Sequence, residues 1–308
     1  MRWLYVILLT LTSMLWGGNF VSGKFVVGHA DSMVLTFLRW GIASLVLLPF
    51  VWMKEKRIIP PKSAWLALIV MGLTGVILFN LFMFWALERT SATNTGLLST
   101  LNPLSIVIFS FLLLKESIRP RQVAAMIISL FGVLIVLTEG HLEYLLQLNF
   151  NVGDLYMLVA VATWGVYSVA GKKALKYVSP YMSTLWSGIL GTIILFPFCI
   201  LHFEISNPIP SFWGAEAYIS VGGTVLAMLF WNIGVQKLGG TASGMFLNLN
   251  PVFTALFAFI LLGEQLLLSQ VVGASVVILG VIYFNYAGKQ QLAKRGKGET
   301  TWEHGKGI

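Results

Sequence analysis

Charged residues are scarce in this 308-residue chain. Asp, Glu, Lys and Arg make up only 10% of it, whereas 57% is hydrophobic. A soluble globular protein carries about 25% charged residues, and the mean hydropathy here is +0.84. The shortage of charge excludes an ordinary soluble domain and indicates a chain that lies largely in lipid.

Cysteine and the usual catalytic motifs are also missing. Cys199 is the only cysteine, so no intramolecular disulfide forms. The cysteine content therefore does not indicate whether the protein lies in an oxidising or a reducing compartment. The sequence has no His-Glu-x-x-His motif, phosphate-binding P-loop or Cys/His metal cluster. It also has no nucleophile–base pair in the middle of a hydrophobic run. These absences argue against an enzyme, and no cofactor or metal is expected.

Acidic residues are absent from the middle of every hydrophobic run. Glu88, Glu116, Asp154, Glu216 and Glu264 all fall near the ends of runs. Proton-coupled carriers commonly use carboxylates or histidines within the membrane. Their absence favours facilitated diffusion or exchange, while sodium held by backbone carbonyls stays open as an alternative.

The chain does contain ten hydrophobic runs of about the 20 residues that a membrane-spanning helix needs. The runs cover roughly 3–27, 33–53, 64–86, 92–114, 120–138, 153–174, 180–202, 212–236, 241–262 and 268–287. Membrane helices tolerate the Gly and Pro residues inside them. We therefore predict an all-α membrane protein with ten transmembrane helices, the first of them an uncleaved span.

Basic residues are distributed unevenly between the two sides of this predicted topology. Of the 20 Lys and Arg residues, 17 fall at the two termini and in the loops on the same side as the termini. Lys24 and Arg89 fall on the other side. Cytoplasmic loops carry the excess of basic residues, so both termini are expected in the cytoplasm. The net charge of +8 then reflects topology rather than a nucleic-acid partner, and residues 288–308 form a cytoplasmic tail.

An internal repeat runs through the chain at a constant offset of 148 residues. Matching pairs include Trp16-Gly17 with Trp164-Gly165, Pro49-Phe50 with Pro197-Phe198, Asn102-Pro103 with Asn250-Pro251, and Glu116 with Glu264. The copies cover 3–138 and 153–287. A unit of five spans delivers its second copy into the membrane upside down. Two inverted five-helix repeats are a common plan of secondary transporters, with the solute site near the midplane.

Several stretches resemble the EamA family of the drug/metabolite transporter superfamily. They are LTSMLWGGNFVSGKFVV, ALERTSATNTGLLSTLNPL and KLGGTASGMFLNLNPVFTALFAFILLGEQ, and the resemblance covers roughly residues 3–287. It implies a ten-helix carrier, usually in a bacterial cytoplasmic membrane, that moves amino acids or other small metabolites, often outward. The copies differ where Arg39 matches Ser187 and where Asn19 matches Tyr167, so any site is asymmetric.

The two Asn-Pro pairs lie near the middle of the fourth and ninth runs. Proline removes a helical hydrogen bond and frees a backbone carbonyl. One interpretation is a kink that lets these helices pack obliquely, with Asn bonding across helices. The other is a wet cavity lined by Asn102 and Asn250. The two are compatible, and Pro103 and Pro251 are candidate hinges.

Other polar and aromatic residues at mid-depth complete the candidate substrate site. A deep tryptophan either fills a notch in the core or forms an aromatic wall for an amphipathic solute. The full set of candidate substrate-binding residues is Trp16, Asn19, Asn80, Ser99, Asn102, Trp164, Tyr167, Asn232, Asn248 and Asn250.

Arg39 lies in the outer third of the second run, where an arginine is costly. We expect it to snorkel outward or to pair with Glu88 as a structural latch. The alternative is a counter-charge for a substrate carboxylate.

The predicted function is a secondary carrier of small amphipathic metabolites, such as amino acids, exported across the cytoplasmic membrane by alternating access. The expected partners are a small-molecule solute and the lipid bilayer. A non-transporting scaffold or sensor, or a channel, is the alternative.

Overall fold

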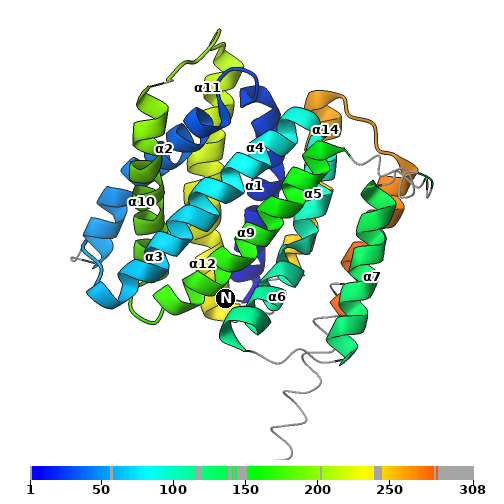
Figure 1. The fold of residues 1–308 in the computed structure, drawn as a ribbon, viewed down its shortest axis with the longest axis horizontal. Coiled ribbons are helices and arrows are strands. Elements are labelled where there is room, and N and C mark those ends of the chain that lie inside the picture. Colours follow the sequence, from blue (N-terminus) through cyan, green and yellow to red (C-terminus); the bar gives the residue numbers. More distant parts are fainter. Residues whose placement is uncertain are drawn as a thin grey trace, which may run out of the picture.

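The computed structural model describes residues 2–55, 58–115, 120–137, 141, 143, 151–201, 203–238, 245–280, 282 and 283. These residues form a bundle of helices (Figure 1). Within the described ranges, β-structure is limited to isolated bridges that join Val27 to Ala30 and Ala30 to Ile205.

The first half of the chain contributes long helices and two locally distorted ones. They are α1 (Arg2–Val26), α2 (Ser32–Glu55), η1 (Lys62–Ala64), α3 (Trp65–Met71), the π-helix η2 (Gly72–Leu78), α4 (Phe79–Arg89), α5 (Ala92–Leu98), the 3₁₀ turn η3 (Ser99–Leu101), α6 (Asn102–Leu114) and α7 (Pro120–Leu137).

The second half repeats this order. It contains α9 (Val152–Ala174), α10 (Pro180–Ile200), α11 (Pro210–Ala217), the π-helix η4 (Tyr218–Leu226), α12 (Ala227–Leu238), the 3₁₀ turn η5 (Met245–Leu249), α14 (Asn250–Leu262) and a last helix at Leu268–Gly280.

Seven helical segments are long and apolar enough to cross a membrane. They are Trp3–Val26, Ser32–Glu55, Lys62–Arg89, Ala92–Leu114, Val152–Ala174, Pro180–Ile200 and Pro210–Trp231. Shorter apolar helices lie at Val123–Gly132, Asn250–Leu262 and Leu268–Gly280, within three further predicted spans. The protein is thus a polytopic helical membrane protein, and the count of ten spans stays a prediction.

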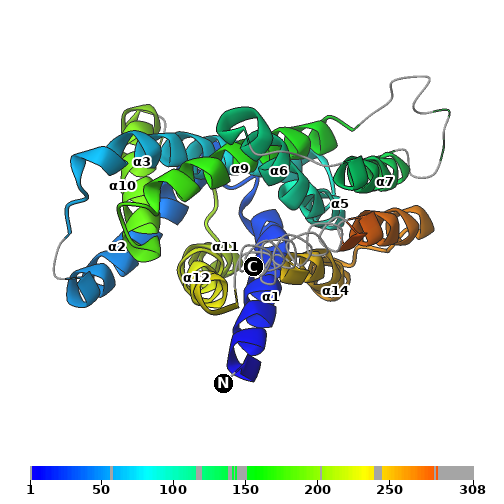
Figure 2. The same ribbon diagram turned by 90° about the horizontal axis from the view of Figure 1, so that it is seen from below.

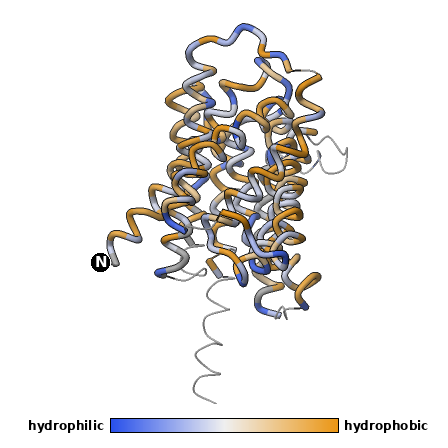
Figure 3. Tube along the Cα trace, turned by 90° about the vertical axis from the view of Figure 1, so that its left-hand side faces the viewer, coloured by the Kyte–Doolittle hydropathy of each residue, from blue (hydrophilic) through white to orange (hydrophobic). Residues whose placement is uncertain are grey.

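Hydrophobic side chains cover the outside of the bundle as well as its core. Leu45, Met53, Phe259 and Leu268 are each more than half exposed. Figure 3 shows hydrophobic residues along most of the helical trace, with hydrophilic residues concentrated in the connections at the two ends. An apolar outer surface is what a lipid environment requires, because lipid solvates it where water does not.

Local distortions recur in both halves at the 148-residue offset. The π-helix η2 ends at Leu78 and η4 ends at its equivalent, Leu226. Likewise α6 begins at Asn102 and α14 at Asn250, each directly after a 3₁₀ turn. The repeated sequence therefore produces the same departures from α-helical geometry twice.

The two halves interlock through glycines on their first helices. A Cβ atom on Gly17 of α1 would lie 2.9 Å from the carbonyl oxygen of Asn250 in α14. Gly165, the equivalent residue of α9, packs as closely against Ser105 in α6. Figure 2 shows α1 beside α12 and α14, and α9 beside α6. Each half therefore supplies a helix that packs against the Asn-Pro helix of the other.

Candidate functional site

A cavity of about 540 Å³ lies between helices of both halves. Its inner wall includes the buried side chains of Asn19, Arg39 and Asn80, whereas its lining reaches the exposed residues Lys172 and Leu175. We call this the central cavity, and the end of the bundle with Lys172 and Leu175 the open end. The volume falls within the range of about 300–1,000 Å³ that is typical of small-molecule sites.

Most of the candidate residues from the sequence line this cavity. They are Trp16, Asn19, Asn80, Ser99, Asn102, Trp164, Tyr167 and Asn250. The side chains of Asn232 and Asn248 lie outside the described part of the structure. The structure therefore brings eight of the ten residues together, while their role in solute binding stays a prediction.

Four buried polar atoms of the lining have no hydrogen-bond partner among the described residues. They are Oδ1 of Asn19, Asn102 and Asn250, and Nε1 of Trp40. An unpaired polar group away from water costs about 1–3 kcal/mol. Such a cost is offset when a polar solute or water occupies the cavity and pairs with these groups.

Arg39 is the cationic group of the inner wall. Its side chain is 6% exposed. Its Nε donates to Thr224 Oγ1 at 3.0 Å, and its Nη1 donates to Asn80 Oδ1 at 2.8 Å. The expected latch to Glu88 is wrong, because Glu88 accepts instead from Ser32 and Arg89. The Arg39 side chain points into the bundle because Thr224 and Asn80 accept its hydrogen bonds there. Its guanidinium lines the cavity.

The partners of Arg39 come from the two π-helical regions. Asn80 follows η2 and donates through Nδ2 to the carbonyls of Gly75 and Val76. Thr224 lies within η4 and donates through Oγ1 to the carbonyl of Ile219, five residues earlier. π-Helical segments are frequent at functional sites. Asn80 and Thr224 therefore each bind carbonyls of their own π-helical segment and also hold Arg39.

Aromatic rings form the remaining walls. Trp16 donates through Nε1 to the carbonyl of Gly223 at 2.9 Å and lies 5.5 Å from the ring of Trp231. Trp164 stacks on Tyr167 at 4.8 Å between ring centroids and lies 5.1 Å from Phe79. All five rings line the central cavity. Such walls bind the apolar part of a solute.

The Asn-Pro pairs break their helices rather than bend them gently. Pro103 and Pro251 each stand at the start of a new α-helix, where a missing N–H has no cost. Asn102 and Pro103 line the cavity, as does Asn250, whereas Pro251 is buried outside it. Neither asparagine side chain oxygen has a partner among the described residues, which matches the cavity-lining interpretation.

Polar contacts join the two halves at the other end of the bundle, which we call the closed end. The Glu264 carboxylate accepts from the backbone N–H of Ala92 at 2.9 Å and from the N–H and hydroxyl of Thr93 at 3.1 and 2.6 Å. Gln270 Nε2 donates to Asn94 Oδ1 at 2.6 Å. The second half thereby caps the first turn of α5.

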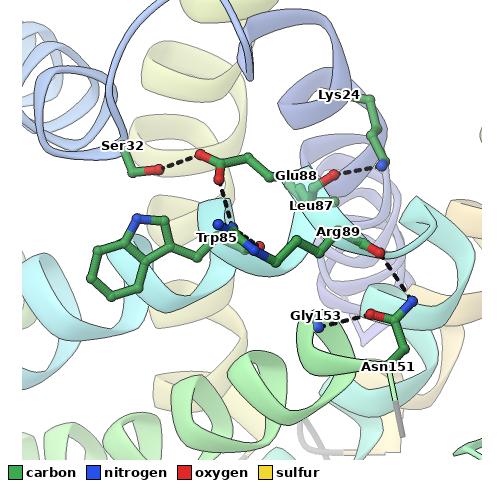
Figure 4. Close-up of polar contacts among 8 residues, drawn as sticks. All are labelled: Lys24, Ser32, Trp85, Leu87, Glu88, Arg89, Asn151 and Gly153. Carbon is green, nitrogen blue, oxygen red and sulfur yellow. Dashed lines mark hydrogen bonds and ion pairs between the residues drawn. The ribbon is translucent and has the colours of Figure 1, made fainter. Parts of the chain in front are cut away.

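Further contacts tie the loops together at this end (Figure 4). Glu88 accepts from Ser32 and Arg89, and Lys24 donates to the carbonyl of Leu87. Asn151 donates to the carbonyl of Arg89 and accepts from the N–H of Gly153. The central cavity therefore reaches the surface at the open end and is separated from the closed end by these polar contacts.

Sequence reasoning missed several residues of the site. Trp40, Phe79, Thr224 and Lys172 line the cavity, but a single Trp, Phe, Thr or Lys near a span carries no distinguishing pattern. The position of a residue along a predicted span also does not predict whether its side chain is buried within the protein. Glu216 is near the start of the segment Pro210–Trp231, as expected, yet it is fully buried within the protein.

The described residues contain no group of three or more His, Cys, Asp or Glu side chains arranged to hold a metal ion. The site is instead an apolar cavity with a few convergent polar groups inside a membrane-embedded helical bundle. That combination defines a membrane transporter as the class of protein.

Comparison with known proteins identifies the family. The EamA-like transporter family matches residues 3–138 and again residues 151–286. The chain belongs to this family. The two matches correspond to the two halves of the repeat.

Individual relatives agree. The chain is 32% identical to the uncharacterized transporter YyaM of Bacillus subtilis, over 91% of this chain and 92% of the relative. It is 33% identical to an uncharacterized transporter of Archaeoglobus fulgidus, over 89% and 95%. A solved crystal structure with 22% identity covers 94% of this chain and 99% of its own, with a TM-score of 0.65. That structure supports the fold alone.

Proposed function

We propose that this transporter is a secondary carrier that exports small amphipathic metabolites, such as amino acids, across the cytoplasmic membrane. The observation that supports the proposal most strongly is the set of unpaired amide oxygens facing the same cavity as the Arg39 guanidinium. A cation and hydrogen-bond acceptors that line one cavity suit a zwitterion.

In the proposed complex, the guanidinium of Arg39 binds the solute carboxylate. Arg39 already uses Nε and Nη1 for Thr224 and Asn80, and its remaining N–H groups, which have no partner among the described residues, offer the planar fork that suits carboxylates. The oxygens of Asn102 and Asn250 accept from the solute ammonium group. The rings around Trp164 enclose the apolar side chain.

Alternating access follows from the inverted repeat that we infer from the five-span unit. The open end contains the start of α1 and the end of α9. With both termini in the cytoplasm, the central cavity is open to the cytoplasm and closed toward the outside. A cavity in that state loads solute from the cell, as export requires. Exchange of conformation between the two halves then opens the other end.

The test is efflux from cells that express the wild type, Asn250→Leu or Phe259→Leu. Cells are loaded with a labelled mixture of amino acids and related metabolites. Asn250→Leu removes an unpaired acceptor from the cavity, whereas Phe259 lies on the exposed face of the same helix, at 63% exposure. We expect saturable efflux of one solute class to be lost in Asn250→Leu and kept in Phe259→Leu, at equal membrane abundance.

Loss of Asn250→Leu from the membrane would instead assign a structural role to Asn250. In that case Asn250→Asp, which keeps an acceptor oxygen, tests the cavity separately. No difference between wild type and Asn250→Leu over the whole panel would contradict the proposal and favour a scaffold or sensor.

A further inference from the structure

Glu216 is a buried carboxylate that the proposed binding mode does not use. Its side chain is 0% exposed. Its Oε1 accepts from the Ser220 hydroxyl at 3.1 Å, and its Oε2 has no partner among the described residues. A buried ionised carboxylate is costly unless it is paired or takes up a proton. Glu216 therefore needs an explanation beyond packing.

A line of side chains connects Glu216 to the cavity. Glu216, Ser220 and Thr224 are four residues apart along α11 and η4. Ser220 donates to Glu216, and Thr224 accepts from Arg39. Arg39 and Glu216 thus lie at the two ends of this line of side chains, and no ion pair within 4.0 Å joins them among the described residues. Polar side chains therefore connect the guanidinium to the carboxylate, although the two groups do not form a direct ion pair.

The elements packed against α11 present few other ionisable groups. Helix α11 contacts α1, α2 and η4. Lys24 of α1 donates to Leu87, and Tyr218 of η4 donates through its hydroxyl to the carbonyl of Leu15. The His29 ring packs against Phe212 of α11, and its Nδ1 donates to the backbone carbonyl of Ser206. Arg39 of α2 is thus the charged side chain that the line of Ser220 and Thr224 connects to Glu216.

We propose that Glu216 is a proton-binding site linked to the charge state of Arg39. When a carboxylate binds Arg39, the guanidinium charge is compensated, and Glu216 loses its stabilising counter-charge. A proton from water then binds Oε2 and forms a neutral carboxyl group. No bond of the solute breaks, and release of the anion reverses the step. Two ligands that favour each other's binding are reciprocally coupled.

This link deepens the proposed carrier function and rests on it for its transport consequence. Solute and proton would cross the membrane together, and their combined gradients would set the direction of net movement. The expectation from the sequence, that no carboxylate couples transport to protons, then no longer holds. The carboxylate was overlooked because it lies near a helix end while the fold buries it.

The test is infrared difference spectroscopy of the purified full-length protein during a pH titration, which needs no solute. The C=O stretching band of a protonated buried carboxyl group is expected in the wild type and in Glu204→Gln, whose target is an exposed acid. The band is expected to be absent in Glu216→Gln. If Glu216→Gln fails to fold, Ser220→Ala serves instead: loss of the bond to Oε1 should move the titration to higher pH.

The link to Arg39 is tested in the same titration. Arg39→Gln removes the positive charge, as a bound anion would, and should move the midpoint of the Glu216 band to higher pH. Arg39→Lys keeps the charge and should move it less. A band that is unchanged in Glu216→Gln, or a midpoint that is the same in wild type and Arg39→Gln, would overturn the inference.

Flux in proteoliposomes separates this inference from the proposed function. With a labelled amino-acid mixture inside, an inside-acid gradient should accelerate efflux by the wild type and by Glu204→Gln but not by Glu216→Gln. Saturable efflux that ignores the gradient in the wild type would leave the carrier intact and overturn proton coupling. If the Glu216 band is observed but no solute is transported, the proposed carrier function would be wrong and the assignment of Glu216 as a proton-binding site would stand.

Discussion

At the scale of single residues, Arg39 determines the character of the cavity. A guanidinium this deep in a membrane protein is costly unless it is hydrogen-bonded, and Asn80 and Thr224 supply those bonds. Both partners also bind carbonyls within the π-helical segments. The distortions and the cation therefore stabilise one another.

Substitution of Thr224 tests this arrangement. Thr224→Val keeps the shape of the side chain but leaves Arg39 Nε and the Ile219 carbonyl without their bonds. We expect a loss of about 1–3 kcal/mol in the free energy of unfolding, measured as thermal unfolding in detergent. Thr74→Val is the matched control, because Thr74 lies in the other π-helix and its hydroxyl donates to Val70, one turn earlier. Equal stability of the two variants would contradict a supporting role for Thr224.

At the scale of helices, close approach of backbones holds the halves together. Gly17 lets α1 approach the Asn250 carbonyl in α14, and Gly165 does the same for α9 against α6. Small residues at such crossings are the usual means of packing helices in membranes. The Asn-Pro breaks occur in the two helices that receive these contacts.

Gly17→Ala is expected to destabilise the protein by about 1–3 kcal/mol, because the added Cβ would lie 2.7 Å from Phe253 Cβ and 2.9 Å from the Asn250 carbonyl oxygen. Gly41→Ala is the matched control, since its nearest neighbour, Thr192 Cγ2, is 3.9 Å away. That variant should be neutral or more stable by about 0.5–1 kcal/mol. Thermal unfolding that ranks the two variants in the opposite order would contradict the packing account.

Contacts between helices of the two halves also hold the closed end together. Glu264→Gln weakens the charge-assisted bonds to Ala92 and Thr93 by about 1.5 kcal/mol, which corresponds to about a tenfold change in an equilibrium. In a Cys199→Ser background, a cysteine replacing the buried Thr95 should then react about tenfold faster with a polar maleimide. Glu88→Gln is the control, because Glu88 contacts Ser32 and Arg89 of its own half. An unchanged rate in Glu264→Gln would show that Glu264 does not hold this end closed.

The sequence predicted the helices and much of the lining, for physical reasons. Long apolar runs and a constant offset are local patterns, and Asn within a run is conspicuous. The partners of Arg39 could not be predicted, because they depend on how α2, α4 and η4 pack together. Burial of Glu216 was missed for the same reason: distance from a helix end gives depth in the membrane but not exposure within the protein.

At the scale of the whole molecule, two interlocked halves surround one central cavity. Local distortions repeat at the 148-residue offset, yet the cavity itself is asymmetric, since Asn19 corresponds to Tyr167 and Arg39 to Ser187. Residues equivalent by sequence pack across the halves: Asn19 lies against Gly223 and Tyr167 against Gly75. In the proposed carrier, the matched packing would allow the halves to exchange conformation, while the solute would meet one distinct set of groups.

Counterflow in proteoliposomes tests the central claim most directly. Vesicles containing the purified protein are preloaded with an excess of the unlabelled solute found in the efflux screen, and uptake of a trace of labelled solute is followed. We expect transient accumulation of label in the wild type and none in Asn250→Leu, because solute binding in the central cavity drives the proposed conformational exchange. Entry of label that never exceeds equilibrium and ignores the internal solute would contradict the carrier and indicate a channel.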